Sequence, residues 1–178
     1  MLDPKSRIKG WKPEEVIVLD TETTGTSNRD EIIQLSAVDG YGRDVLNIFL
    51  KPEYIRSWPG AEAVNHISPA MVQDKRTMAQ SRTQLQNFLL RYNCIVGYNI
   101  GFDLRMLKQS GLNIDHLDVV DVMPMYVQHY GVIKNGRKAA KLVEAAAHYG
   151  YDFGAHDSLE DVKATLVVLE NLMREGLC

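Results

Sequence analysis

Two acidic residues stand one residue apart directly after an apolar run. The run is Val16-Ile17-Val18-Leu19, and Asp20-Thr21-Glu22 follows it at once. Because side chains alternate along a strand, Asp20 and Glu22 are expected to point to the same side of the chain. In sheets that alternate with helices, ligands bind where strands end. An Asp-x-Glu step is common by chance, so by itself it also fits solvated acids on a loop.

Two further acidic groups follow later in the chain. Asp103 comes a few residues into a predicted helix, just after a short apolar strand, and its structural alternative is to stabilise the helix N-terminus. His156 stands five positions before Asp161 at the start of the last predicted helix. Asp157 or Ser158 could cap that helix. Each group alone therefore has a purely structural explanation.

Taken together, these residues indicate a metal site. Carboxylates gathered at one place repel one another, and some would take up protons unless cations neutralised them. Oxygen ligands without paired thiols or histidines favour Mg²⁺ or Mn²⁺. A histidine beside such ions suits a general base that works near neutral pH. The set Asp20, Glu22, Asp103, Asp161 and His156 therefore fits two-metal hydrolysis of a phosphodiester.

The elements that would position these residues can be predicted from hydrophobic patterning. Apolar runs and turn signals predict five strands, at residues 16–20, 31–39, 44–50, 94–98 and 117–122. Gly40-Tyr41-Gly42 predicts a hairpin between the second and third strands, which should be antiparallel. Helical spacing predicts helices at 79–92, 102–109, 124–130, 139–149 and 157–175, and the proline-bearing segment 51–75 is predicted to be irregular.

The order of these elements predicts an α/β fold. Strands cluster early and then alternate with helices, which indicates a mixed sheet, mainly parallel beyond the first hairpin, with helices on its faces. With 178 residues, 45% of them hydrophobic, the chain fits one domain with its own core. We expect residues 1–15 to be a polar leader and residues 16–178 to be that domain.

Charge and cysteine content restrict the expected binding partners and the expected cellular compartment. The net charge is −3, so a nucleic acid would have to be held by a local basic patch or by bound cations. Cys94 and Cys178 give neither a disulfide framework nor a zinc pattern, and Cys94 is expected to be buried. No apolar run approaches the ~20 residues needed to span a bilayer. We expect a cytoplasmic protein without membrane contact.

The three motifs resemble those of a known family, the DEDDh or DnaQ-like exonucleases, which include proofreading exonucleases of bacterial DNA polymerases. The motifs are VIVLDTETTG with Asp20 and Glu22, VGYNIGFDLRML with Asp103, and HDSLEDVKATLVVL with His156 and Asp161. The spacing of His156 to Asp161 is typical of the histidine branch of this family. The resemblance covers residues 16–172, nearly the whole chain.

The resemblance implies an RNase H-like fold, a five-stranded mixed sheet with helices on both faces. It also implies a 3′→5′ exonuclease that releases 5′-mononucleotides from the 3′ end of single-stranded nucleic acid, with DNA as the first expectation. Two divalent cations, Mg²⁺ or Mn²⁺, would be held by Asp20, Glu22, Asp103 and Asp161, and His156 would deprotonate the attacking water. The substrate-contacting positions would be Thr23, Asn65, His66 and Asn99.

Some positions depart from the family pattern, and several alternatives stay open. Tyr98 stands where the family often has histidine, and Asn65-His66-Ile67-Ser68 replaces a common His-Gly-Ile-Thr segment, which leaves specificity open. An RNA-trimming exoribonuclease or oligoribonuclease uses the same chemistry, and a DNA polymerase subunit is a candidate partner. A catalytically silent nucleic-acid-binding module would be expected to lack an acid or the histidine, and all five are present. A phosphatase using Asp20 as nucleophile leaves His156 and Asp103 without roles.

Overall fold

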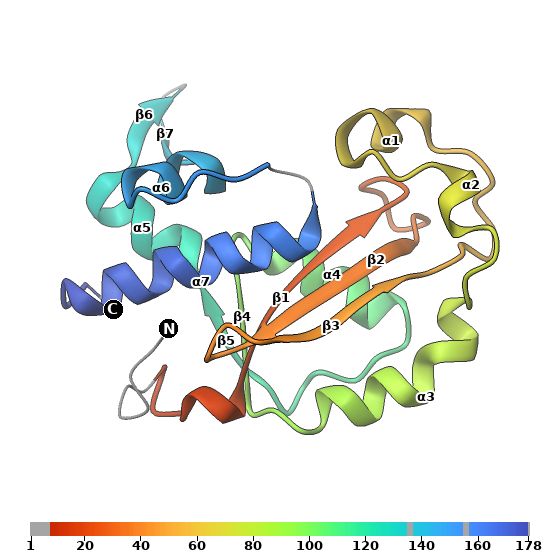
Figure 1. Cartoon of the computed structure of the whole chain (residues 1–178), viewed down its shortest axis with the longest axis horizontal. Helices are drawn as coiled ribbons and strands as arrows, with labels where there is room; N and C mark the ends of the chain where they lie inside the picture. The colour runs from red at the N-terminus through yellow and green to blue at the C-terminus, as the bar shows by residue number, and fades with distance from the viewer. Residues whose placement is uncertain (1–7, 135–136, 155–156, 178) are drawn as a thin grey trace.

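A mixed sheet with helices on both faces forms the body of the protein (Figure 1). The computed structural model describes residues 8–134, 137–154 and 157–177, with the backbone alone for 134, 137 and 138. The strands of the main sheet, in the order β3-β2-β1-β4-β5, are β1 (Val16–Thr23), β2 (Ile32–Asp39), β3 (Asp44–Phe49), β4 (Cys94–Gly97) and β5 (Asp118–Asp121). The helical elements are η1 (Pro13–Glu15), α1 (Pro59–Asn65), α2 (Pro69–Val72), α3 (Met78–Leu89), α4 (Gly101–Gln109), α5 (Val122–Tyr130), α6 (Leu142–His148) and α7 (Ser158–Arg174).

The topology confirms the mixed sheet predicted from the sequence. β1, β2 and β3 are antiparallel neighbours, whereas β4 pairs with β1 and β5 with β4 in parallel. The predicted turn joins β2 to β3, and Gly42 adopts a φ of 78° there, a conformation that glycine reaches without steric cost. The carboxyl ends of β1, β4 and β5 therefore meet at one edge of the sheet.

Strand β1 shows why the first apolar run has no polar position. Val16 and Val18 pack into the core beneath α5, α6 and α7, whereas Ile17 and Leu19 pack into the core formed with α3 and α4. A strand buried on both faces needs apolar residues at every position. The same alternation places the residues after Leu19 alternately beneath α7 and beside α4.

Two short helices lie within the segment that was predicted to be irregular, so that prediction is wrong. α1 and α2 each begin at a proline, Pro59 and Pro69. Proline is tolerated in the first turn of a helix because its missing N–H would have no partner there. The Trp58 indole donates to the Ile67 carbonyl over 2.7 Å, and both residues pack against β2 in a separate small core.

The hairpin of β6 (Val132–Lys134) and β7 (Arg137–Ala139) was not predicted either. The prediction of a helix over 139–149 placed its start too early, because Ala139 belongs to β7 and α6 begins at Leu142. The sequence does carry a signal for this hairpin, since an Asn-Gly dipeptide at positions 135–136 is a sequence pattern typical of two-residue hairpin turns.

The N-terminal segment is attached to the body where the structure describes it. Ile8 is buried in the core beneath α7, and the Trp11 indole donates to Asp118 over 2.8 Å. Cys94 is fully buried, as expected, and Cys178 lies outside the described residues. Among the described residues there is no helix of the length and apolar character that crossing a membrane requires.

Candidate active site

Asp20 and Glu22 lie on β1 itself, because the strand continues to Thr23 rather than ending at Asp20 as predicted. Their register partners on β2 are Ser36 and Gln34. Both carboxylates take the face that Val16 and Val18 share, which is the face covered by α7. Thr21, between them, takes the opposite face, beside α4.

Asp161 is brought to Asp20 by the first turn of α7. Asp157, one of the two caps that the sequence left open, caps this helix by accepting from the Leu159 N–H over 3.0 Å. The Ser158 hydroxyl is buried and donates to the hydroxyl of Ser36, the register partner of Asp20, over 2.5 Å. This contact holds the first turn of α7 directly over the middle of β1.

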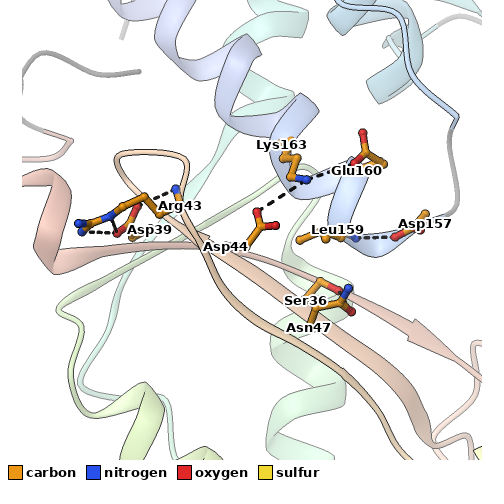
Figure 2. A network of polar contacts seen from close by, with 9 residues as sticks. All are labelled: Ser36, Asp39, Arg43, Asp44, Asn47, Asp157, Leu159, Glu160 and Lys163. Atoms are coloured by element: carbon orange, nitrogen blue, oxygen red, sulfur yellow. Dashed lines mark hydrogen bonds and ion pairs between the residues drawn. The ribbon is translucent and has the colours of Figure 1, made fainter.

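A polar network fastens the same turn to the β2–β3 hairpin (Figure 2). Lys163 lies 3.7 Å from Asp44 at the start of β3 and 3.2 Å from Glu160. The hydroxyl of Ser36 in turn donates to Asn47 on β3 over 3.1 Å. The position of Asp161 therefore depends on β1, β2, β3 and α7 together.

Asp20, Glu22 and Asp161 form a group with metal-ligand geometry. Each offers one carboxylate oxygen, and the three oxygens lie within 4.8 Å of one another. This all-oxygen donor set suits a hard divalent cation such as Mg²⁺ or Mn²⁺.

Asp103 reaches this group from α4, on the other face of β1. It is the third residue of the helix, and its side chain is buried. Its Oδ1 accepts from the Thr21 hydroxyl over 2.6 Å and from the Thr21 N–H over 3.0 Å. Thr21, which carries no charge and was not singled out from the sequence, therefore orients the fourth carboxylate.

The neighbouring carboxylates disturb the protonation of Asp20 and Glu22. Burial raises the pKa of Asp20 well above its usual range, and the charges of Asp103, Asp161 and Glu22 raise it further. Burial, followed by the charge of Asp161, raises the pKa of Glu22 to about 7, although a hydrogen bond from Asn65 opposes this. Burial also raises the pKa of Asp103, against the hydrogen bonds from Thr21. Desolvated, mutually repelling acids are a donor set that divalent cations would stabilise.

Two of the predicted substrate positions lie beside the acids, since Thr23 follows Glu22 on β1 and Asn65 at the end of α1 hydrogen-bonds to Glu22. Asn65 is buried, donates to the Thr23 carbonyl over 3.2 Å, and accepts from the Ile67 N–H over 3.1 Å. It therefore fixes the end of β1 as well as contacting Glu22. His66 is exposed and ends α1 in the left-handed conformation, with a φ of 59°.

Asn99 marks the other side of the site. It is exposed, has a φ of 59°, and its N–H donates to Asp121 over 2.8 Å. Asp121 also accepts from the Met123 N–H, so one carboxylate fixes the β4–α4 junction and the start of α5. Asp121, Ser36 and Thr21 could not be predicted from the sequence, since no local pattern marks a residue whose partner lies far along the chain.

His156 lies outside the described residues, because residues 155 and 156 are not described. The sequence places it directly before Asp157, the residue that caps α7. Its role as a general base stays a prediction.

A cleft of about 470 Å³ opens from the acids toward α6. Its lining includes Asp20, Asn99, Met123, Lys141, Leu142 and Asp161. The acids therefore border a space that is large enough for part of a ligand.

This chain belongs to the RNase T family of exonucleases, whose pattern it matches over residues 17–169. It is 30% identical to "uncharacterized exonuclease CP81" of Escherichia phage 186, over 96% of this chain and 94% of that protein. It is 26% identical to RNA exonuclease 4 of Candida glabrata, over 89% of this chain and 60% of that protein. It is also 27% identical to the PolC-type DNA polymerase III of Clostridium perfringens, of which it spans 11%. The protein is therefore an exonuclease, a phosphodiester hydrolase, and the predicted family is confirmed.

Solved structures confirm the RNase H-like fold. Exonuclease X in complex with 5′ overhanging duplex DNA is 21% identical and superposes with a TM-score of 0.68, over 90% of this chain and 92% of that chain. Escherichia coli exonuclease I in complex with a dA16 oligonucleotide is 19% identical with a TM-score of 0.73, over 91% of this chain and 41% of that chain.

The raised pKa values predict how the metal-free protein responds to pH. Glu22 binds its proton more tightly in the folded state, with a pKa of about 7 against an ordinary 4.5. The resulting stabilisation is complete below pH 4.5 and is lost as the pH rises through about 7. In EDTA, the melting temperature followed by circular dichroism should therefore fall between pH 5 and 8.

The matched control for this effect is Glu22→Gln, which removes the titrating group with little change of shape. Its melting curve in EDTA should depend less on pH than that of the wild type. Adding Mg²⁺ should reverse the wild-type trend, because cations bind the deprotonated acids. Identical pH profiles of the two proteins in EDTA would refute this account of Glu22.

The contact between Thr21 and Asp103 predicts a measurable positioning effect. Thr21→Val keeps the branched shape but removes the hydroxyl that donates to the buried Asp103 carboxylate. A hydrogen bond to a charged group contributes about 1.5 to 3 kcal/mol, so we expect turnover or Mn²⁺ affinity to fall by roughly 10- to 100-fold. Thr21→Ser, which restores the hydroxyl, should recover most of the loss. Wild-type Mn²⁺ affinity by calorimetry, together with wild-type turnover, in Thr21→Val would show that the hydroxyl does not position Asp103.

Proposed function

We propose that this protein is a two-metal-ion 3′→5′ exonuclease that removes 5′-mononucleotides from single-stranded nucleic acid, DNA in the first place. The proposal assigns this activity to residues 16–178 as a single domain. The observation that carries it is the meeting of Asp20, Glu22 and Asp161 within 4.8 Å, with Asp103 held behind them by Thr21.

In this proposal each residue of the site has a separate task. Asp20, Glu22 and Asp161 offer oxygens to two divalent cations, Mg²⁺ or Mn²⁺, and Asp103 helps to position them. When bound, the cations would supply positive charge to the scissile phosphate and acidify a water molecule. His156 takes the proton from the attacking water. Thr23, Asn65, His66 and Asn99 are placed around the end of the substrate strand.

The proposed substrate and the proposed direction of digestion rest on similarity to other nucleases. The 3′→5′ direction follows from the resemblance of the three motifs to DEDDh exonucleases. DNA is favoured by the fold likeness to exonuclease I and exonuclease X, both solved with DNA. RNA is the second candidate, since the chain is similar to RNA exonuclease 4. A polymerase subunit is proposed as a partner on the similarity to part of a PolC-type DNA polymerase III.

End-labelled substrates test the proposal directly. Single-stranded DNA, duplex DNA and RNA, digested side by side with Mg²⁺ and with Mn²⁺, should give products shortened from the 3′ end together with 5′-mononucleotides. A 3′-phosphorylated strand and a closed circle should resist. Asp20→Ala and EDTA should each abolish hydrolysis, while circular dichroism shows that the variant is folded. Efficient cutting of the circle, or full activity in EDTA, would overturn the proposal.

His156 separates an active enzyme from a metal-binding module. His156→Ala should lower turnover by ~10² to 10⁴-fold, the usual contribution of a positioned general base. Metal and oligonucleotide binding should stay close to those of the wild type. The acidic limb of the pH–rate profile should flatten or move, because hydroxide must then replace the base. Wild-type turnover with an unchanged acidic limb would assign His156 a structural role.

A further inference from the structure

We propose that a basic groove beyond the end of β1 binds the phosphates of a second nucleic-acid strand. This is the strand paired with the one being digested, where it continues past the 3′ end as a 5′ overhang. The basic groove is a cavity of about 570 Å³ whose lining includes Arg29, Lys51, Tyr54 and Arg82. A smaller hollow of about 340 Å³ shares Lys51 with it and adds Arg56. The inference rests on the proposed function and adds a second strand to it.

Segments that are far apart in the sequence meet to form the basic groove. Residues 28–31 belong to the β1–β2 loop, and residues 51–55 belong to the segment after β3. The first turns of α3 and the end of α4 complete the lining. Arg105 and Gln109 of α4 donate to backbone carbonyls of the β1–β2 loop over 2.9 and 2.7 Å. The loop is therefore fastened to α4, and the groove has fixed walls.

The acids of the groove are bound by backbone groups, whereas its cations are not paired. Asp30 and Glu53 each accept from one backbone N–H, over 2.8 and 2.9 Å, and Glu31 accepts from the N–H groups of residues 53–55. By contrast, no carboxylate within the described part of the chain makes an ion pair with any of the four groove cations, which are Arg29, Lys51, Arg56 and Arg82. These cations are therefore available to a ligand of opposite charge.

The composition of the surrounding segment suits a polyanion. Residues 51–109 contain eight lysines and arginines against four aspartates and glutamates, one of which is Asp103 of the active site, whereas the whole chain has a net charge of −3. Tyr54 is 81% exposed, so its ring is open to solvent beside the groove cations. Cations that bind phosphates, together with an aromatic ring on which a base can stack, are the features by which proteins hold single-stranded nucleic acid.

The basic groove lies beyond the proposed terminal nucleotide as seen from the scissile phosphate. Along β1, Asp20 is followed by Thr23, the proposed neighbour of that nucleotide, and then by Thr24. The Thr24 hydroxyl donates to Asp30 and its N–H donates to the Glu31 carbonyl, each over 2.9 Å, and both acids line the groove. Because a strand rises about 3.3 Å per residue, the groove begins roughly 13 Å beyond Asp20.

This position selects the second strand as the occupant. The digested strand ends at its 3′ nucleotide, so none of its own phosphates continue beyond Thr23. The cleft that contains Asp20 opens instead toward α6, and α6 and α3 lie on opposite sides of the molecule (Figure 1). An opposing strand that extends past the 3′ end would bring its phosphates to the groove.

The test removes two groove charges and compares substrates with and without an overhang. Arg29→Gln/Arg82→Gln changes two exposed residues whose side chains make no hydrogen bond or ion pair with other described residues, so the fold should be retained. Fluorescence anisotropy, with Ca²⁺ in place of Mg²⁺, should show weaker binding of a duplex with a short 5′ overhang. Two lost phosphate contacts to a single strand lower the salt slope of log affinity by about 1.4, which corresponds to about 25-fold weaker binding at 0.1 M salt if binding is equal at 1 M. Binding of a blunt duplex and of the digested strand alone should match the wild type, as should the rate of digestion of single-stranded DNA.

Two matched variants isolate the effect of charge in the basic groove. Arg29→Lys/Arg82→Lys keeps the charge and should bind the overhanging duplex like the wild type. Lys12→Gln/Arg91→Gln removes two exposed cations that precede β1 and β4, at the amino ends of these strands, and should also bind it like the wild type. An unchanged salt slope in Arg29→Gln/Arg82→Gln, or an equal loss of affinity for the digested strand alone, would overturn the inference. A failure of wild-type protein to shorten 3′ ends would instead contradict the proposed function, since the binding measurement needs no turnover.

Discussion

The structure depends on holding four carboxylates together where they are partly removed from water. Burial and mutual repulsion both raise the pKa values of Asp20 and Glu22, so the metal-free cluster opposes its own assembly. The acids come from three elements, β1, α4 and α7, which are held together by the two cores on either side of the sheet. The strength of the sheet and of its helix contacts is therefore what makes the acidic cluster possible.

Neutral side chains contact two of the acids and the first turn of the helix that bears a third. Thr21 uses its hydroxyl and its N–H to hold Asp103, and Ser158 joins the first turn of α7 to Ser36, opposite Asp20. Asn65 fixes the end of β1 and opposes the rise in the pKa of Glu22. Because Thr21, Ser158 and Asn65 carry no charge, these contacts leave the negative charge of the cluster for the cations that the donor set fits. A basic side chain in their place would hold the acids equally well but would compete with those cations.

The strands and helices that bear the acids could be predicted from the sequence better than the residues that hydrogen-bond to them. The five main strands and the helices that bear Asp103 and Asp161 could be predicted because both cores impose a local pattern, such as the unbroken apolar run before Asp20. Asp103 could be associated with Asp20 and Glu22 because the carboxyl ends of the parallel strands β1 and β4 meet at one edge, whereas Asp161 on α7 was associated with them through the motif resemblance. By contrast, the partners Thr21, Ser36 and Asp121 form contacts over long sequence separations that no local pattern marks. α1, α2 and the β6–β7 hairpin were missed because prolines and an alanine-rich run were given more weight than turn geometry.

Basic residues are kept apart from the acidic cluster for the same reason, because the acids have to stay available to bind metal cations. An acidic cluster that binds cations repels a polyanionic substrate until the cations are in place, so attraction for the rest of the strand has to come from elsewhere. If basic residues stood within the cluster, they would neutralise the acids and displace the cations. If they stood far from it, the strand end would not be guided to Asp20. Lys141 meets both conditions, because it lines the cleft that begins at Asp20 and Asp161 without belonging to the acidic cluster. The separation between the acids and the basic side chains is thus as much a property of the site as the close approach of the acids to one another.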